Sequence, residues 1–318
     1  MKAKLLGTGS YLPAKIVSND ALSKMVDTND AWIRERTGIR ERRVSDAGTA
    51  TSDLAVLAAT KALAAAKVAP AEIDLIIVCT CSPDMLFPSV ACILQDKLKL
   101  TGAAAFDLSA ACSGFNFGLS TAASFIESGK YKKILLVGAD TLTKYLDWTD
   151  RGTCILFGDG AGAVVLGATD KDEGVLASFM MAEGHLGSNL TMPGGGSRGL
   201  ADKYIRMNGK EVFKFAVRVL EVSIKKVLEL AGKTAAEIDL FIPHQANKRI
   251  IDHVSKKMGL PKEKVYVNLH KYGNTSAASV PIALDEALAE GKIKSGDLLI
   301  LSGFGAGLTY GSNLVKWG

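Results

Sequence analysis

Short, continuous apolar runs alternate along this chain with longer stretches whose apolar positions recur at helical spacing. Leu75–Val78 and Ile134–Val137 contain no polar residue, which is typical of strands in a parallel sheet covered on both faces. Leu54–Lys67 and Val219–Ala231 have apolar residues at the spacing of a helix that is buried on one side. The pattern predicts an α/β protein.

The pattern occurs twice. Residues 71–77 and 236–242 differ at one position, and Ile134–Gly138 recurs at the same offset as Leu299–Gly303. The helix end at Gly129 recurs at Gly291, a slightly smaller offset, and we assign this difference to a loop indel. We therefore interpret the chain as two duplicated α/β halves.

The boundary between the halves is expected at the polar stretch Thr169–Gly174. This places an N-terminal half at residues 1–170 and a C-terminal half at residues 171–318. Two such halves, each with a mostly parallel sheet, are expected to pack as one five-layer α/β/α/β/α body, a thiolase-like arrangement.

Composition narrows the class of protein. The chain has 318 residues, of which 48% are hydrophobic and 22% charged, so it is expected to be globular. No apolar run reaches the roughly 20 residues that span a bilayer, and the N-terminus lacks a secretory apolar region. Five cysteines without CxxC spacing and four scattered histidines predict free thiols and no metal site. We expect a cytoplasmic protein.

The net charge of +5 is concentrated in one region. Residues 201–264 contain 14 Lys and Arg against 8 Asp and Glu, whereas the rest of the chain is about neutral. Such an excess predicts an acidic partner: nucleic acid, a phosphorylated ligand or an acidic protein. A solvated lysine-rich surface is the alternative. No basic stretch interleaved with aromatic residues suggests nucleic acid.

Cys112 is the candidate nucleophile. It stands between a strand that ends near Leu108 and a helix expected from about Ser113 to Ser128. Unpaired amides and the positive end of a helix dipole favour a thiolate there. The other four cysteines are better interpreted as inert buried residues.

Two further polar residues are expected beside this cysteine. His244 ends the repeated strand, and Asn274 is reached from Cys112 by the offset that relates Gly129 to Gly291, again just before a helix. Ligands of open α/β sheets bind at the carboxyl ends of strands. A packed histidine and a helix-capping asparagine are the structural alternatives, but the convergence of three segments favours one site.

A glycine-rich loop follows the matching strand of the second half. Gly303–Gly307 lets backbone amides approach a ligand closely, so the Ala306 amide is a candidate donor to an oxyanion. A simple tight turn is the alternative interpretation of the loop.

The stretches around Cys112, His244 and Asn274, with the Gly303–Gly307 loop, resemble β-ketoacyl-acyl carrier protein synthase III of bacterial type II fatty-acid synthesis. The resemblance runs end to end. An asparagine as the third residue of the set Cys112, His244 and Asn274 is shared with chalcone-synthase-like enzymes. Elongating synthases have a second histidine at that position.

The resemblance implies a two-step reaction without a cofactor or metal, in which coenzyme A (CoA) thioesters are substrates. Cys112 takes the acyl group of a short acyl-CoA, while the Cys112 and Ala306 amides hold the oxyanion. His244 and Asn274 then stabilise the enolate that forms when malonyl-acyl carrier protein loses CO₂, and this carbanion attacks the acyl-enzyme.

The resemblance also implies how the two substrates bind. Trp32 and Arg151 would enclose the adenine of CoA. The residues expected along the CoA path are Thr28, Trp32, Arg36, Arg151, Phe213, Asn247 and Arg249. The amphipathic segment from Asn247 to Met258 presents basic residues which, with one more before it, resemble a docking site for the acidic carrier protein: Lys214, Arg249, Lys256 and Lys257.

Phe87 matches a position that crosses a homodimer interface in this family and closes the partner's acyl pocket. Its bulk predicts a short primer such as acetyl. Two alternatives of function stay open: a condensing enzyme of specialised metabolism with another primer or acceptor, and a Cys-His-Asn thioester hydrolase. A non-catalytic binding protein of the same fold is disfavoured because Cys112, His244 and Asn274 are all present.

Overall fold

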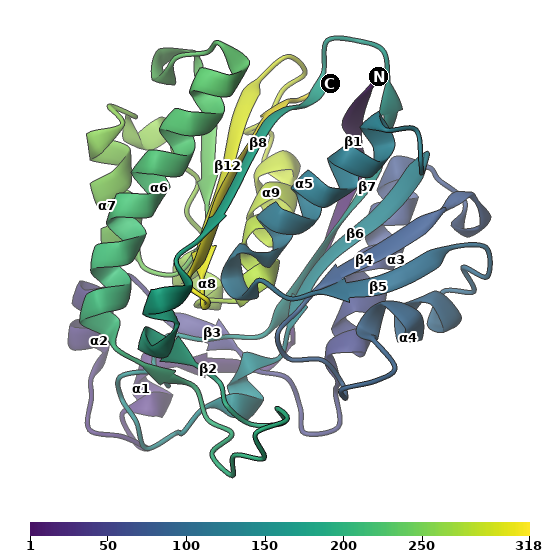
Figure 1. The fold of residues 1–318 in the computed structure, drawn as a ribbon. Coiled ribbons are helices and arrows are strands. Elements are labelled where there is room, and N and C mark those ends of the chain that lie inside the picture. Colours follow the sequence, from purple (N-terminus) through teal and green to yellow (C-terminus); the bar gives the residue numbers. More distant parts are fainter.

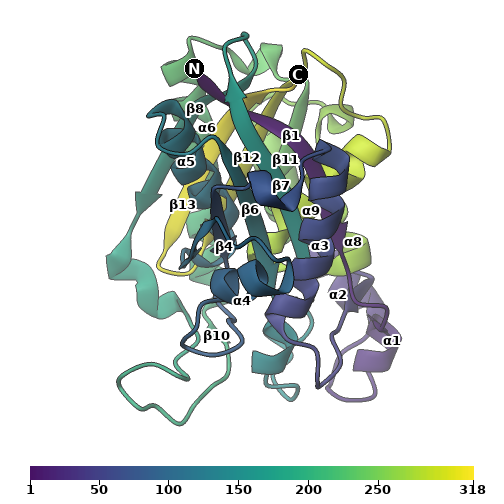
Figure 2. The same ribbon diagram turned by 90° about the vertical axis from the view of Figure 1, so that its right-hand side faces the viewer.

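A computed structural model describes all 318 residues and shows two large β-sheets with helices on both sides of each (Figure 1), besides two small two-stranded sheets. The view turned by 90° shows helix α3 (Thr51–Ala66) lying along strands of the first sheet (Figure 2). None of the helices combines the length and apolar character needed to cross a lipid bilayer.

The first sheet has the strand order β1-β7-β6-β4-β5. Its strands are β1 (Lys2–Tyr11), β4 (Leu75–Cys79), β5 (Ala104–Leu108), β6 (Lys133–Asp140) and β7 (Gly160–Thr169). Strand β4 is parallel to β5 and β6, whereas β7 runs antiparallel to both β6 and β1.

The second sheet has the strand order β11-β12-β13-β8. Its strands are β8 (Gly174–Ala182), β11 (Leu240–Pro243), β12 (Leu298–Gly305) and β13 (Thr309–Lys316). Only β11 and β12 are parallel. The expectation of mostly parallel sheets is therefore wrong. Residues 306–308 alone connect β12 to β13, and so short a loop joins antiparallel neighbours because a parallel crossover needs a dozen or more residues.

Six helices complete the layers. Two lie outside the first sheet, two lie between the sheets and two lie outside the second sheet: α3 with α4 (Val90–Lys97), α5 (Gly114–Glu127) with α9 (Ser279–Ala289), and α6 (Gly209–Ala231) with α7 (Lys248–Lys257). The short elements are β2 (Ile16–Ser18), α1 (Asn19–Leu22), α2 (Asp30–Thr37), β3 (Glu41–Arg43), β9 (Leu190–Thr191), β10 (Arg206–Met207) and α8 (Leu269–Tyr272).

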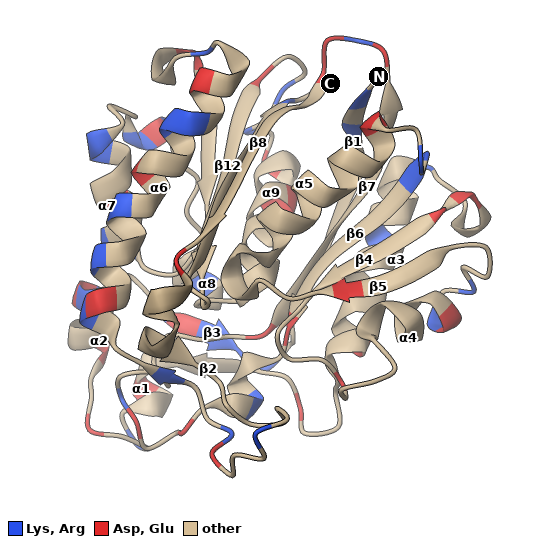
Figure 3. Ribbon diagram, viewed as in Figure 1, with Lys and Arg blue, Asp and Glu red and all other residues tan.

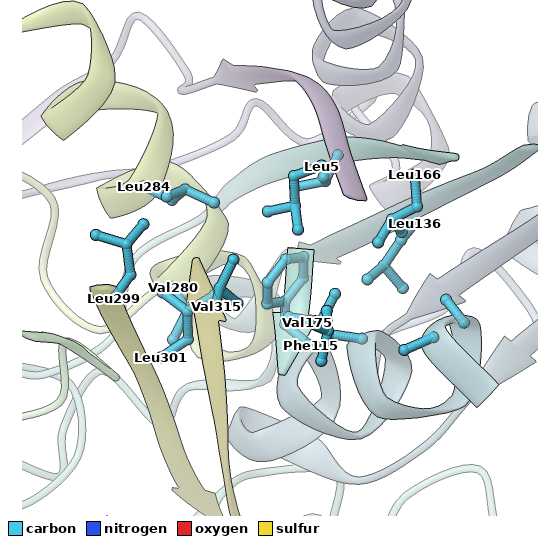
Figure 4. Packing of buried hydrophobic residues seen from close by; sticks show 14 of the residues in the cluster. Leu5, Phe115, Leu136, Leu166, Val175, Val280, Leu284, Leu299, Leu301 and Val315 are labelled. Atoms are coloured by element: carbon cyan, nitrogen blue, oxygen red, sulfur yellow. The ribbon is translucent and has the colours of Figure 1, made fainter. Parts of the chain in front are cut away.

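Alternate side chains of one strand enter different apolar cores, as the pleat requires. Leu75 and Ile77 join a central cluster with α5, α9 and strands of both sheets, and Figure 4 shows Phe115 and Leu284 of this cluster packed between the sheets. Ile76 and Val78 instead pack under α3 and α4. A third cluster lies between the second sheet and α6 and α7. The predicted five layers are confirmed.

The structure corrects the register of the duplication around Cys112. The 3₁₀-turn η2 (Ala111–Ser113) corresponds to η7 (Ser276–Ala278), and each turn begins with a residue of positive φ, 45° at Ala111 and 53° at Ser276. The turns thus keep the offset of the repeated strands, so Cys112 corresponds to Ala277, not Asn274. Helix α9 has 11 residues and α5 has 14. The smaller offset at the helix ends therefore comes from a shorter helix, not from a loop indel.

Candidate active site

One cavity brings Cys112, His244 and Asn274 together. They arrive from turn η2, from the end of β11 and from the loop before η7, and η2 packs against η7 at the junction of the halves. Most other residues of the wall are apolar, including Phe213 and Phe304. A largely apolar cavity with a few convergent polar groups is the usual form of a small-molecule site.

Cys112 is a buried thiol in this cavity, with 6% of its surface exposed. Burial raises the pKa of Cys112 to about 12; the Ser276 hydroxyl lowers it and the Asp140 carboxylate raises it. A rise from 9.0 to about 12 corresponds to roughly 4 kcal/mol, whereas a helix N-terminus contributes at most about 2 kcal/mol. Burial therefore outweighs the effect predicted for the helix N-terminus, and the isolated Cys112 is a thiol at neutral pH.

Two backbone amides beside the sulfur are free. The N–H groups of Cys112 and Ala306 donate no hydrogen bond within the protein. The loop of Ala306 passes close over η2: a Cβ atom at Gly305 would lie 2.6 Å from the Cys112 nitrogen, and one at Gly303 would lie 2.5 Å from Asn116 Oδ1. Glycine at both positions therefore permits this approach, and the two amides are available to an oxyanion.

His244 is held on three sides. Its backbone N–H donates to the Ser302 carbonyl at 2.7 Å, its Nδ1 lies 2.6 Å from the Ser279 hydroxyl oxygen, and its ring packs edge to face on Phe304, with 5.3 Å between centroids. Burial lowers the pKa of His244 to about 3, so the imidazole is neutral at physiological pH. Nε2 has no hydrogen-bond partner in the protein.

The side-chain oxygen of Asn274 is occupied, and its nitrogen faces the cavity. The Ser276 backbone N–H donates to Oδ1 at 2.8 Å, which directs Nδ2 toward the Cys112 thiol, and a hydrogen bond from Asn274 lowers the pKa of that thiol. Its backbone connects the halves: Asn274 N–H donates to the Leu156 carbonyl at 2.8 Å, and Gly158 N–H donates to the Asn274 carbonyl at 2.9 Å. The cavity thus offers a thiol, a side-chain amide N–H donor and the Nε2 atom of a neutral imidazole.

A second, surface cavity adjoins the first and shares Phe213 and Asn247 with it. It contains six of the residues expected along the CoA path: Trp32, Arg36, Arg151, Phe213, Asn247 and Arg249. Thr28 is outside both walls; its Oγ1 is buried without a hydrogen-bond partner. The two cavities thus share part of their walls between the surface and Cys112.

Arginines already contact the half-buried Trp32 indole of this surface cavity. The guanidinium carbon of Arg151 lies 5.3 Å from the Trp32 ring centroid, and that of Arg36 lies 5.9 Å away. Arg151 also donates to the Asp27 carbonyl at 3.1 Å. Because Arg151 and Trp32 touch, an adenine ring enters between them only if Arg151 moves.

The sequence did not indicate a third cavity, which also reaches Cys112. Its wall is almost wholly apolar and includes Leu142, Phe157, Leu190 and Ile205. Several of these residues come from the long connection between β8 and α6, where no periodic pattern marks a wall residue. Cys81, interpreted as an inert buried residue, also lines this cavity, and Cys92 is exposed rather than buried.

Phe87 lies outside all three cavities, with 84% of its surface exposed. Leu86 beside it is 76% exposed.

The predicted docking residues all lie on helices α6 and α7, where Lys and Arg recur (Figure 3). Lys214 pairs with Glu211 at 2.8 Å and Lys257 pairs with Glu221 at 3.0 Å, while Lys256 has no ion pair. Arg249 lies over the Phe213 ring, 5.5 Å from its centroid. The apolar stripe of α7 is buried, as predicted.

Known proteins match the whole chain. Two family models match, 3-oxoacyl-[acyl-carrier-protein] synthase III at residues 106–184 and its C-terminal region at residues 228–317. A relative from Caldanaerobacter subterraneus, named β-ketoacyl-[acyl-carrier-protein] synthase III, is 53% identical over 99% of this chain and 98% of its own.

Two solved structures are also similar to this chain. The 3-oxoacyl-[acyl-carrier-protein] synthase III of Aquifex aeolicus is 50% identical, with a TM-score of 0.95 over 99% of this chain and all of its own. The priming β-ketosynthase of the R1128 polyketide biosynthetic pathway is 37% identical, with a TM-score of 0.93 over 99% of this chain and 96% of its own.

Proposed function

The chain belongs to the 3-oxoacyl-[acyl-carrier-protein] synthase III family, the condensing acyltransferases that initiate fatty-acid biosynthesis, and we propose that Cys112 is the residue through which it transfers the acyl group. The observation that carries the proposal is the cavity in which the Cys112 thiol meets Nε2 of His244 and Nδ2 of Asn274.

In the first half-reaction, Cys112 Sγ attacks the carbonyl carbon of a short acyl-CoA, and the carbon–sulfur bond to CoA breaks. The free amides of Cys112 and Ala306 donate to the oxyanion of the tetrahedral intermediate. The proton of the Cys112 thiol ends on the CoA sulfur, so this step consumes no net proton. The acyl chain then lies in the apolar cavity beside Cys112.

In the second half-reaction, malonyl-acyl carrier protein replaces CoA. Its thioester carbonyl accepts hydrogen bonds from His244 Nε2 and Asn274 Nδ2, which stabilise the enolate as CO₂ leaves. The carbanion forms a carbon–carbon bond to the acyl carbon, the bond to Cys112 Sγ breaks, and the sulfur takes up one proton. Because decarboxylation makes the nucleophile, no strong base is required, which agrees with a neutral His244.

Substrate binding follows from the path between the cavities. The surface cavity with Trp32, Arg36, Arg151 and Arg249 suits the adenine and phosphates of CoA. Thr28, near the start of α2, is retained as a more distant contact. The basic residues of α6 and α7 suit an acidic carrier protein: Lys214, Arg249, Lys256 and Lys257.

We propose a homodimer and a short primer such as acetyl. Leu86 and Phe87 are large apolar side chains with little contact to their own chain, and β5 beside them is an edge strand, so a second copy is the expected cover. Sedimentation that gives a monomer at micromolar concentration would contradict this. The five free cysteines suit a reducing cytoplasmic compartment.

Product analysis with acetyl-CoA and malonyl-acyl carrier protein tests the function. We expect acetoacetyl-acyl carrier protein and CO₂ from the wild type, and no acetoacetyl-acyl carrier protein from Cys112→Ala. Free acetate as the main product would instead indicate a thioester hydrolase. Condensation only with other primers or with a CoA-bound acceptor would favour specialised metabolism, an alternative that the polyketide-pathway relative keeps open.

A further inference from the structure

We propose that Ser279 is a positioning residue for the condensation step: its hydroxyl donates to Nδ1 of His244 and so holds the single imidazole proton on Nε2. The proposal rests on the function above, in which Nε2–H of His244 donates to the thioester carbonyl of malonyl-acyl carrier protein. It adds a residue outside the predicted site and a defined tautomer.

The hydrogen bonds of Ser279 determine the direction of donation. Its Oγ lies 2.6 Å from His244 Nδ1, and the Gln245 backbone N–H donates to the same oxygen at 3.4 Å. The Ser279 hydroxyl makes no other hydrogen bond in the protein, and Ser279 is 1% exposed. His244 Nδ1 is therefore the one acceptor available to the hydroxyl hydrogen.

The opposite tautomer would leave a buried hydrogen without a partner. If Nδ1 carried the proton, it would donate to Ser279 Oγ, and the hydroxyl hydrogen would have no acceptor in the protein. A buried polar group left unpaired disfavours such a state on the order of ten- to a hundredfold. Protonation of both nitrogens is also disfavoured, because burial lowers the pKa of His244 to about 3.

A role of Ser279 in helix capping is a weaker explanation. Ser279 is the first residue of α9, but the N-cap is Ala278, and no side chain caps this helix. The Ser279 hydroxyl is thus not occupied by the amides of its own helix. It lies instead between the helix start and the His244–Gln245 strand end.

The tautomer matters because both donors must face one carbonyl oxygen. Asn274 presents Nδ2 because the Ser276 amide occupies its Oδ1, and Ser279 does the equivalent for His244. An Nδ1–H imidazole would present the Nε2 lone pair to the thioester oxygen, and a donor would become a repulsive contact. Acylation of Cys112 uses other donors, the amides of Cys112 and Ala306, and should not depend on Ser279.

Nuclear magnetic resonance with ¹⁵N-labelled histidine tests the tautomer in the wild type, where four histidines give a short spectrum. The His244 signals are those lost in His244→Gln. We expect the pyrrole-type nitrogen to be Nε2. A pyrrole-type Nδ1 would overturn the proposal, and this readout requires no Ser279 variant to fold.

Kinetics of Ser279→Ala test the consequence. We expect its condensation rate with malonyl-acyl carrier protein to fall on the order of ten- to a hundredfold, while Cys112 acylation by acetyl-CoA stays within about threefold. Ser52→Ala is the matched control, because it also removes a buried hydroxyl, one that bonds the Asp84 carboxylate at 2.7 Å near the start of α3, outside the first sheet. The control should change neither half-reaction.

Three outcomes separate the possible failures. Unchanged condensation in Ser279→Ala would overturn the positioning role. Equal losses in both half-reactions would mean a general structural role and would also overturn it. If the wild type forms no condensation product at all, the proposed function itself fails, while the tautomer remains readable by resonance.

Discussion

Gly305 lies directly over the backbone of Cys112: a Cβ atom at position 305 would come within 2.6 Å of the Cys112 nitrogen and 3.0 Å of the Ser113 nitrogen. Both distances are shorter than van der Waals contacts, and backbone atoms on both sides cannot rotate away. The end of β12 therefore packs directly against turn η2, which contains Cys112. This contact fixes the position of the Ala306 amide relative to Cys112 Sγ.

Gly305→Ala should move the Ala306 amide away from the Cys112 amide, so that the two no longer donate to one oxyanion. We expect the rate of Cys112 acylation to fall about a hundredfold or more, the usual result of losing one such donor. Gly48→Ala is the control, since a Cβ atom there meets nothing within 4 Å, and it should acylate as fast as the wild type. Rapid mixing with acetyl-CoA measures both variants. An unimpaired Gly305→Ala enzyme would mean that the amides of this loop are not used.

Trp32→Ala should selectively weaken the binding of CoA thioesters. Stacking of a base on an aromatic ring contributes about 1–3 kcal/mol, so KM for acetyl-CoA should rise about ten- to a hundredfold with little change in kcat. The S-acetyl thioester of N-acetylcysteamine, which lacks the nucleotide, should react equally with both enzymes. Equal losses with both thioesters would show that Trp32 acts through the fold and not through adenine.

Lys256→Glu should weaken only the binding of the carrier protein. Lys256 is exposed on α7 and has no ion pair, so reversing its charge removes attraction without breaking a contact. We expect a severalfold rise in KM for malonyl-acyl carrier protein that shrinks at high salt. Acylation by acetyl-CoA should not change. Lys226→Glu on α6, where Lys226 pairs with Glu229 at 2.9 Å, matches the charge change, and an equal effect there would mean that only net charge matters.

Buried His244 should make the protein sensitive to acid. Its pKa of about 3 in the folded state lies below the ordinary 6.5, so below pH 6.5 the unfolded chain binds a proton that the folded chain does not. The contribution of His244 to the free energy of unfolding is fully present above pH 6.5. It decreases by about 1.4 kcal/mol for each pH unit below that value. Between pH 6.5 and 4.5, wild type should lose about 2–3 kcal/mol more than His244→Gln in urea unfolding. Parallel pH profiles would mean that His244 ionises normally.

The strands and the layering were predictable from local pattern, because the duplicated segments repeat a buried strand and its preceding helix. Leu75–Val78 and Leu240–Ile242 are strands as expected. Sheet direction was not predictable, since β13 and β7 are buried whichever way they run, and their pairing depends on loops without a periodic pattern. The division at residues 170 and 171 stays a prediction, although no strand of either sheet crosses it.

The site was predictable where chemistry and chain position agreed. Cys112, His244 and Asn274 do line one cavity, although the register used to reach Asn274 was wrong, because the true counterpart of Cys112 is Ala277. Ser279 was not singled out, because a serine at a helix start is common, and only its 2.6 Å distance to Nδ1 distinguishes it. Part of the apolar wall of the third cavity comes from the long connection between β8 and α6. No sequence pattern in that connection indicates which side chains point into the cavity.

Intact mass of the purified protein after mixing with acetyl-CoA alone tests the central claim most directly, with Cys112→Ala alongside. We predict an acetyl adduct on the wild type, removed by malonyl-acyl carrier protein, and none on Cys112→Ala. An adduct on both proteins, or none with any acyl-CoA, would contradict the assignment of Cys112 as the residue that carries the acyl group.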